Sequence, residues 1–222
     1  MTGHTPAHSP PADAQRQRAT DVRALVGRLW PRLPLLLAGA ALAGCSSVTF
    51  ARSAVDFDTA YRTTLYRLHI VAAPAPAGDA ALGAMVAKMA QRAINHHRDY
   101  IVRQASTANQ LDASACSEKI EGVLHLEPFV CRSEDGAKVR LTARLLRCQD
   151  GAIVFEGAVH DAWASEDDNL VQVRAQYVRE HGKAVEPMVA PLFHAVRELV
   201  DALPRPKLEK DADIDEKIEL GQ

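Results

Sequence analysis

Three long strand-like runs, joined by two tight turns, constrain the fold of this chain more than any other feature. The runs are Glu118–Cys131, Lys138–Cys148 and Ala152–Trp163. In the middle run apolar residues alternate with polar ones, which is typical of a strand with one buried face. The joining segments, Ser133–Gly136 and Gln149–Gly151, contain the Asp and Gly residues that hairpin turns favour. The runs therefore predict an antiparallel meander, in which Pro128 indicates an edge position or a bulge.

A strand, a helix and a second strand are predicted ahead of this meander. Arg62–Ala73 is rich in strand formers and is followed by Pro74. From Asp79, the expected N-cap, to His97, apolar residues recur at the spacing of one buried helix face. Asp99–Arg103 is predicted to be the second strand. Because a helical crossover of this length suits a βαβ unit, we expect the two strands to be parallel.

Two helices and a charged tail are predicted after the meander. Ser165, followed by three acidic residues, indicates the start of one helix, and Gly182 indicates its end. Glu186–Leu203 carries an apolar stripe and predicts a last helix, in which Pro191 indicates a kink or a later start. Residues 204–222 mix acids and bases without an apolar face, so we expect a disordered tail there.

The first 44 residues have the layout of a leader that ends in a secretory signal peptide. Arg28 and Arg32 precede the apolar run Leu33–Ala43, which ends in small residues ahead of Cys45. That run is too short to cross a bilayer, which takes about 20 apolar residues. Removal of residues 1–44 leaves 178 of the 222 residues, enough for one domain. It also moves the formal net charge from -2 to about -5, which gives no electrostatic case for binding nucleic acid.

The four residues Leu42-Ala43-Gly44-Cys45 resemble the lipobox of bacterial lipoproteins. This resemblance implies cleavage between Gly44 and Cys45, with a diacylglycerol on the Cys45 thiol. Several acyl chains, palmitate among them, would form a stable membrane anchor. In Gram-negative lipoproteins an Asp after the lipidated Cys tends to retain the protein in the inner membrane. Because this chain has Ser46, the resemblance implies sorting to the outer membrane, with residues 45–59 as a lipidated tether.

Export also permits disulfides, and three further cysteines are present, Cys116, Cys131 and Cys148. If the first two runs of the meander pair around their turn, Cys131 lies near the turn and Cys148 lies about 35 Å away. Cys116 precedes the first run at that same far end. Since a disulfide needs α-carbons within about 7 Å, we expect a Cys116–Cys148 bridge and a free Cys131. The alternative is three reduced, buried thiols. No Cys-x-x-Cys spacing occurs, so a zinc site is not expected.

The order of the predicted elements, together with the segment Leu145–Glu156, resembles periplasmic lipoproteins of the curli-secretion CsgG and TolB N-terminal type. The segment Ala93–Val102 also resembles an uncharacterised lipoprotein family of myxobacteria and Leptospira. These resemblances imply an export pore, an assembly accessory or a lipoprotein of unknown role, and they carry over no catalytic residues. The long membrane-inserting hairpins of curli pores are absent from the sequence, which argues against a pore.

Two polar clusters are candidates for ligand binding. His96-His97-Arg98-Asp99 could hold a metal or an anion, but adjacent helix residues point about 100° apart, which favours a solvated helix end. Glu166-Asp167-Asp168 could bind calcium, although a capped helix N-terminus also explains these acids. Neither a Gly-x-Ser-x-Gly motif nor a glycine-rich phosphate loop occurs. We therefore predict no catalytic residues, no metal ligands and no cofactor.

These observations predict an α+β domain over residues 60–203, with a mixed five-stranded sheet and C-terminal helices. We expect it to be lipid-anchored in the outer membrane and to face the periplasm. The expected function is that of a non-enzymatic accessory or scaffold that binds another envelope protein. The alternative is a lipoprotein that binds a small ligand or an envelope polymer, and a hydrolase comes third. An exposed apolar patch would favour the scaffold, and a concave pocket with convergent polar groups would favour a binder or an enzyme.

Overall fold

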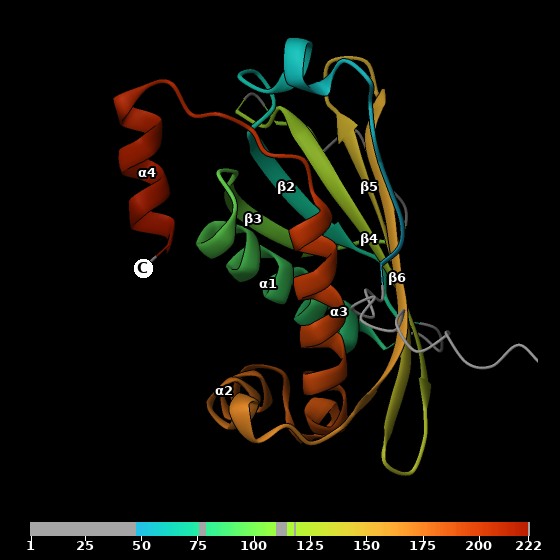
Figure 1. Ribbon diagram of the computed structural model, residues 1–222. Coiled ribbons are helices and arrows are strands. Elements are labelled where there is room, and N and C mark those ends of the chain that lie inside the picture. The colour runs from blue at the N-terminus through green and yellow to red at the C-terminus, as the bar shows by residue number, and fades with distance from the viewer. Residues whose placement is uncertain (1–47, 76–78, 110–114, 118, 222) are drawn as a thin grey trace, which may run out of the picture. The chain divides into compact units, whose positions relative to one another are not determined.

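The computed structural model describes residues 48–75, 79–109, 115–117 and 119–221, which belong to the unit Gly44–Gln222 (Figure 1). The strands are β1 (Val48–Ser53), β2 (Arg67–Ala72), β3 (Ile101–Thr107), β4 (Gly122–Arg132), β5 (Gly136–Arg147) and β6 (Ile153–Ala164). The α-helices are α1 (Ala80–His97), α2 (Val171–His181), α3 (Val189–Ala202) and α4 (Asp211–Gly221). Short helical turns cover Phe57–Tyr61, Asp168–Leu170 and Lys183–Met188.

All six strands form one mixed sheet in the order β1-β6-β5-β4-β2-β3. Strands β4, β5 and β6 form the expected antiparallel meander, and β2 and β3 are parallel, as the crossover through α1 predicts. The chain is therefore an α+β protein, as expected, with one strand more than the sequence suggested.

Helices α1 and α3 cover one face of the sheet (Figure 1). The alternation in β5 places Val139, Leu141 and Leu145 on that face, where none of the three has measurable exposure. The apolar stripe of α3, including Leu192 and Val196, packs into the same core. Burial of such side chains, at about 25 cal/mol per Å² of apolar surface, is the main force that holds the two layers together.

Pro128 lies in an interior strand and not at an edge. Strand β2 pairs with β4 only as far as the Ala72–Leu126 pair, so Pro128 lies beyond the part of β4 that β2 covers. On its other side β4 continues to pair with β5 through Pro128 and Leu141. The missing N–H of the proline is thus tolerated because the β2 side of the strand is unpaired at this point.

The expected tether over residues 45–59 contains the sixth strand. Within it, β1 pairs antiparallel with β6 and forms an edge of the sheet. Three of the six residues of β1 are polar and all but Val48 are exposed, so this edge strand carries little of the apolar signal on which prediction depends.

The expectation of a disordered C-terminal tail was wrong. Residues Asp211–Gly221 form helix α4, which lies against α1 and β3. The sequence of α4 has no strong apolar stripe because the helix docks chiefly through charged and polar side chains. A search for apolar periodicity cannot detect an element of that kind.

Candidate functional site

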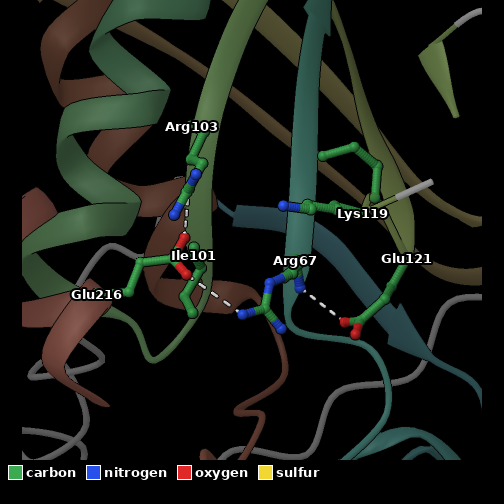
Figure 2. Close-up of a pocket in the computed structure, with 7 residues that line it drawn as sticks. Arg67, Ile101, Arg103, Lys119, Glu121 and Glu216 are labelled. Atoms are coloured by element: carbon green, nitrogen blue, oxygen red, sulfur yellow. Dashed lines mark hydrogen bonds and ion pairs between the residues drawn. The ribbon is translucent and has the colours of Figure 1, made fainter. Parts of the chain in front are cut away.

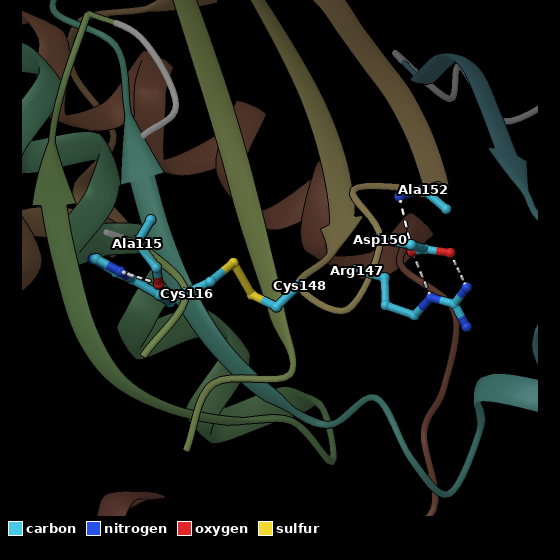
Figure 3. The surroundings of a disulfide bond; sticks show 7 residues. Ala115, Cys116, Arg147, Cys148, Asp150 and Ala152 are labelled. Atoms are coloured by element: carbon cyan, nitrogen blue, oxygen red, sulfur yellow. Dashed lines mark hydrogen bonds and ion pairs between the residues drawn. A yellow bond between two sulfur atoms is a disulfide. The ribbon is translucent and has the colours of Figure 1, made fainter. Parts of the chain in front are cut away.

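The predicted lipidation and cleavage residues, Gly44 and Cys45, lie outside the described residues. Among the described residues, no helix is both long enough and apolar enough to span a bilayer. The cysteine pair is described: Cys116 and Cys148 are disulfide-bonded with their α-carbons 5.5 Å apart, and Cys131 is free and exposed (Figure 3). This is the pairing that the meander geometry predicts.

The disulfide fixes a short segment against the sheet where β4 begins and β5 ends. Ala115, next to Cys116, is buried in a small cluster with Val71 and Val123. The carbonyl of Ala115 also lies 3.1 Å from Nδ1 of His69 on β2. These side chains lie on the sheet face opposite α1 and α3, so the segment covers that face near the start of β4.

The rest of that face, over β4, β5, β6 and β1, has no described helix on it, and we call it the open face. Cross-strand pairing places its side chains in rows. One row contains Phe129, Arg140 and His160, and a neighbouring row contains Thr142, Ala158 and Phe50. Phe50 is 51% exposed and Phe129 is 41% exposed, which is high for large aromatic side chains.

The charges on the open face are unbalanced. Arg144 is paired with two carboxylates, at 3.2 Å from Glu156 and 3.8 Å from Glu127. Arg52 and Lys138 have no ion-pair partner within the described part of the chain. Arg140 likewise has no carboxylate partner there, and its guanidinium carbon lies 5.1 Å from the ring centre of Phe129. The face therefore presents unpaired cations next to exposed aromatic rings.

A hollow of about 340 Å³ lies beside these residues. Phe129, Arg140, Thr142 and Glu127 line it from the sheet, and Pro74 closes it from the segment after β2. A hollow of this size can accept a side chain from another protein. Arg and aromatic residues around such a hollow are typical of the residues that contribute most to protein–protein binding.

A second concave site, of about 590 Å³, lies between α1, α2 and α3, with Leu220 of α4 at its edge. Its apolar lining includes Phe193 and Val196, and its polar lining includes Arg92 and Arg197. Arg92 is engaged by Glu180 at 2.7 Å. The groove is therefore lined by both apolar and polar side chains, and the Arg92 guanidinium already has a carboxylate partner.

Within the described chain, neither predicted polar cluster gathers three metal-ligating side chains, although His96 and His97 lie in the lining of the groove between α1, α2 and α3. His96 and His97 are exposed at the end of α1, whereas Arg98 is buried and donates a hydrogen bond to the Val200 carbonyl at 2.8 Å. Nε2 of His97 lies 2.8 Å from Nη1 of Arg197. Partial burial of the imidazole and the nearby Arg197 cation both lower the pKa of His97. No group of three or more His, Cys, Asp or Glu residues able to hold a metal occurs within the described ranges.

The acidic run caps a short helical turn, as one of its two interpretations predicted. The capping residue is Asp167, and not Ser165 as the sequence suggested. The Asp167 carboxylate accepts a hydrogen bond from the Asn169 amide at 2.9 Å. The same carboxylate lies 3.0 Å from His194 of α3. These contacts tie the start of α2 to α3.

A charged pocket of about 360 Å³ lies where α4 meets β2 and β3 (Figure 2). Arg67, Arg103 and Lys119 line it together with Glu121 and Glu216. Arg103 contacts Glu216 at 2.5 Å, and Arg67 contacts the same carboxylate at 3.2 Å. Glu121 accepts hydrogen bonds at 2.8 Å from two backbone amides, those of Tyr66 and Arg67. Lys119 is exposed and has no ion-pair partner among the residues described.

The contacts of α4 shift the pKa values of its own charged groups. The hydrogen bond from Arg67 lowers the pKa of Asp213, which is only 4% exposed. Burial acts to raise the pKa of Glu216, but hydrogen bonds from Arg103 and Arg67 outweigh it and the pKa is lowered. Burial lowers the pKa of Lys217 to about 8, while its ammonium donates to the carbonyls of Ile94 and Tyr100.

Sequence reasoning missed this pocket. Its cations lie on β2, on β3 and in the segment before β4, and its acids lie on α4 and in that same segment. One local signal was available: Asp213, Glu216 and Lys217 follow a three-and-four spacing, which places them on one side of a helix.

No family model matches the chain, and no curated protein matches it. Among solved structures, PelC from Paraburkholderia phytofirmans, a dodecamer, is similar over 58% of this chain and 91% of its own, with 16% identity and a TM-score of 0.35. A neuraminyllactose-binding hemagglutinin homologue from Helicobacter pylori is similar over 71% and 91%, with 13% identity and a TM-score of 0.30. The uncharacterised lipoprotein B from Nitrosomonas europaea is similar over 61% and 86%, with 17% identity and a TM-score of 0.25. Likenesses this distant carry no argument about function.

Proposed function

We propose that this protein is a lipid-anchored accessory of the outer membrane. It faces the periplasm, has no catalytic role, and binds a second envelope protein through its open face. The observation that carries the proposal is the set of unpaired cations beside exposed aromatic rings, Arg52 and Phe50 on β1 and Arg140 and Phe129 on β5 and β4. The anchor at Cys45 and the sorting to the outer membrane follow from the lipobox and from Ser46.

The partner is expected to present an acidic surface. Arg52, Lys138 and Arg140 have no carboxylate partners within the described residues, so an acidic surface would supply the missing counter-charges. Complementary charge of this kind speeds association and selects among partners, while the aromatic rings and the hollow beside Phe129 provide the apolar contact.

Site-specific photo-crosslinking tests the proposal. A photoreactive phenylalanine analogue is placed at Phe50, at Phe129, or at Val171 on α2, and the intact protein is illuminated in its own membranes. Val171 is a matched control because its side chain is 44% exposed, a fraction similar to that of Phe129, but it lies on α2, away from the open face. We expect one defined protein adduct at Phe50 and Phe129 and none at Val171. Charge reversal by Lys138→Glu with Arg140→Glu should remove the adduct. Equal adducts at all three positions, or none at any, would contradict the proposal.

One observation favours a second function, binding of a small ligand in the groove between α1, α2 and α3. Its volume of about 590 Å³ lies in the range of small-molecule sites, and its lining is mixed apolar and polar. Native mass spectrometry of the protein released gently from its membranes tests this function. A bound small molecule that is lost in Phe193→Trp, which fills the groove, and kept in Val171→Trp would support it. A mass equal to that of the bare chain would count against it.

A further inference from the structure

Helix α4 is docked by charge more than by apolar contact. Asp213 accepts hydrogen bonds from the Tyr66 hydroxyl at 2.8 Å and from Arg67 at 2.5 Å. The two isoleucines of the helix, Ile214 and Ile218, are 40% and 55% exposed, and Leu220 is the one leucine of α4, packed against the core while partly buried. The Arg103–Glu216 pair is open to solvent on its arginine side, and such pairs are individually weak, about 0–1 kcal/mol, and are screened by salt. The Arg67–Asp213 pair is largely buried, so Arg67 needs a carboxylate partner, whichever chain supplies it. A helix held in this way can be exchanged for another ligand with the same charges.

The charge of the pocket depends on whether α4 is in place. With α4 docked, Glu216 lies between Arg67 and Arg103 (Figure 2), and Asp213 also pairs with Arg67. Without α4 the only carboxylate left in the lining is Glu121, whose charge is already stabilised by two backbone amides. The two arginines and Lys119 would then face an empty site.

We propose that this pocket is a binding site for an acidic polypeptide segment, in which α4 is the resident ligand that a partner's segment displaces. The segment should carry two carboxylates one helical turn apart, because Asp213 and Glu216 have that spacing. Arginine is suited to such recognition because its planar guanidinium group can donate to two carboxylates at once. Here Arg67 contacts both Asp213 and Glu216.

The connection to α4 permits this exchange. Between α3 and α4, residues 204–209 form neither helix nor strand. Pro206 is buried and the Lys207 amide donates to the Arg62 carbonyl at 2.7 Å, so the first half of the connection stays attached to the domain. If the chain beyond Leu208 moves away, the core loses only contacts at its edge, those of Leu220 and of the Tyr66 hydroxyl. This site is separate from the open face, so the proposal goes beyond the proposed function and does not depend on it.

A peptide that copies α4 provides the probe. Fluorescently labelled peptide Glu209–Gly221 is titrated against the intact chain and its anisotropy is measured. In the wild type the resident α4 competes and binding should be weak. In Glu216→Gln, and more so in Asp213→Asn with Glu216→Gln, the resident helix competes less well, and we expect binding at least about tenfold tighter. The single variant keeps the test valid if the double variant unfolds.

Two controls make the result specific. Adding Arg103→Glu, at a position 61% exposed, to Glu216→Gln should abolish binding, whereas adding Arg140→Glu on the open face should leave it unchanged. A peptide with both carboxylates replaced by lysine should not bind. Equal binding to wild type and Glu216→Gln, or binding that survives Arg103→Glu, would overturn the proposal. The proposal would also be overturned if the Glu216→Gln variant formed a dimer and the peptide dissociated that dimer. Such a result would identify α4 of a second copy as the ligand of the pocket.

Discussion

Asn95, at the end of α1, is a single side chain on which the join between α1 and β3 depends. Its amide donates to the Val102 carbonyl at 2.9 Å and accepts from the Val102 amide at 3.0 Å, and the residue is 6% exposed. We predict that Asn95→Ala lowers the free energy of unfolding by about 2 kcal/mol, because the Val102 amide loses its buried partner while the Val102 carbonyl keeps a hydrogen bond from Gln91. His96→Ala, next to it but exposed, should cost less than about 0.5 kcal/mol. Chemical denaturation of both variants measures the difference.

The cysteines give a second prediction at the scale of single residues. The bond joins positions 32 residues apart, and a closed loop of that size stabilises the folded state by about 3–4 kcal/mol. Cys116→Ser with Cys148→Ser should lose that amount under oxidising conditions. Cys131→Ser, which removes an exposed free thiol, should change the stability by less than about 0.5 kcal/mol. A larger loss for Cys131→Ser than for the pair would show a different bridge in solution.

Single residues also show why the sequence predicted the cysteine pairing but not the charged pocket. The ends of a meander are determined by local alternation and by turns, so the positions of Cys116, Cys131 and Cys148 along paired strands could be worked out. Arg103 and Glu216 are 113 residues apart, and no local pattern relates them. Such a contact becomes visible only when the whole chain is folded.

At the scale of secondary structure, the docking of α4 should depend on pH in two separate ranges, and in both it should strengthen as the pH rises. Asp213 and Glu216 have lowered pKa values in the docked state, so the stabilisation they give is present above about pH 4.5 and is lost as the pH falls further. Lys217 has a pKa of about 8 when docked, against an ordinary value of 10.5, so its buried charge opposes docking at neutral pH. Docking should therefore strengthen as the pH rises from about 8 to 10.5, although nearby Asp99 favours the charged form.

Hydrogen exchange of residues 211–221, corrected for the intrinsic pH dependence of exchange, measures this docking. Lys217→Met removes the titrating lysine, so exchange of α4 in this variant should stay constant from about pH 8 to pH 10, while the loss at acid pH remains. Burial and the hydrogen bond to Asp213 raise the pKa of Tyr66, so the stabilisation from that hydroxyl falls only above about pH 10, in the variant and in the wild type alike. Exchange in α3, whose core residues are buried, provides the reference. If the wild type and Lys217→Met behaved alike above pH 8, the assignment to Lys217 would be wrong.

The elements that sequence reasoning missed share one property. Strand β1 and helix α4 both lie at the periphery, and neither has an apolar pattern. Strand β1 is held by backbone hydrogen bonds to β6, and α4 is held by ion pairs and hydrogen bonds to β2, β3 and the end of α1. Elements that contribute to the core, such as α3 and β5, were predicted because burial requires a regular apolar pattern.

At the scale of the whole molecule, the domain should fold without residues 1–44. Among the described residues, every buried member of its main core cluster lies between Phe57 and Leu203. We predict that a chain beginning at Cys45 unfolds within about 2 °C of the full chain, a difference of less than about 1 kcal/mol for a domain of this size. Thermal unfolding followed by circular dichroism measures it. A fall of more than about 5 °C would show that the N-terminal residues stabilise the fold.

The position of β1 sets a limit on where such a protein can work. Its first residue, Val48, is the third residue after Cys45, and three fully extended residues span at most about 10 Å. In a chain acylated at Cys45, the β1 edge of the sheet would therefore lie within about 10 Å of the lipid headgroups. Its partner would have to come to the membrane surface, as another anchored or membrane-embedded protein does.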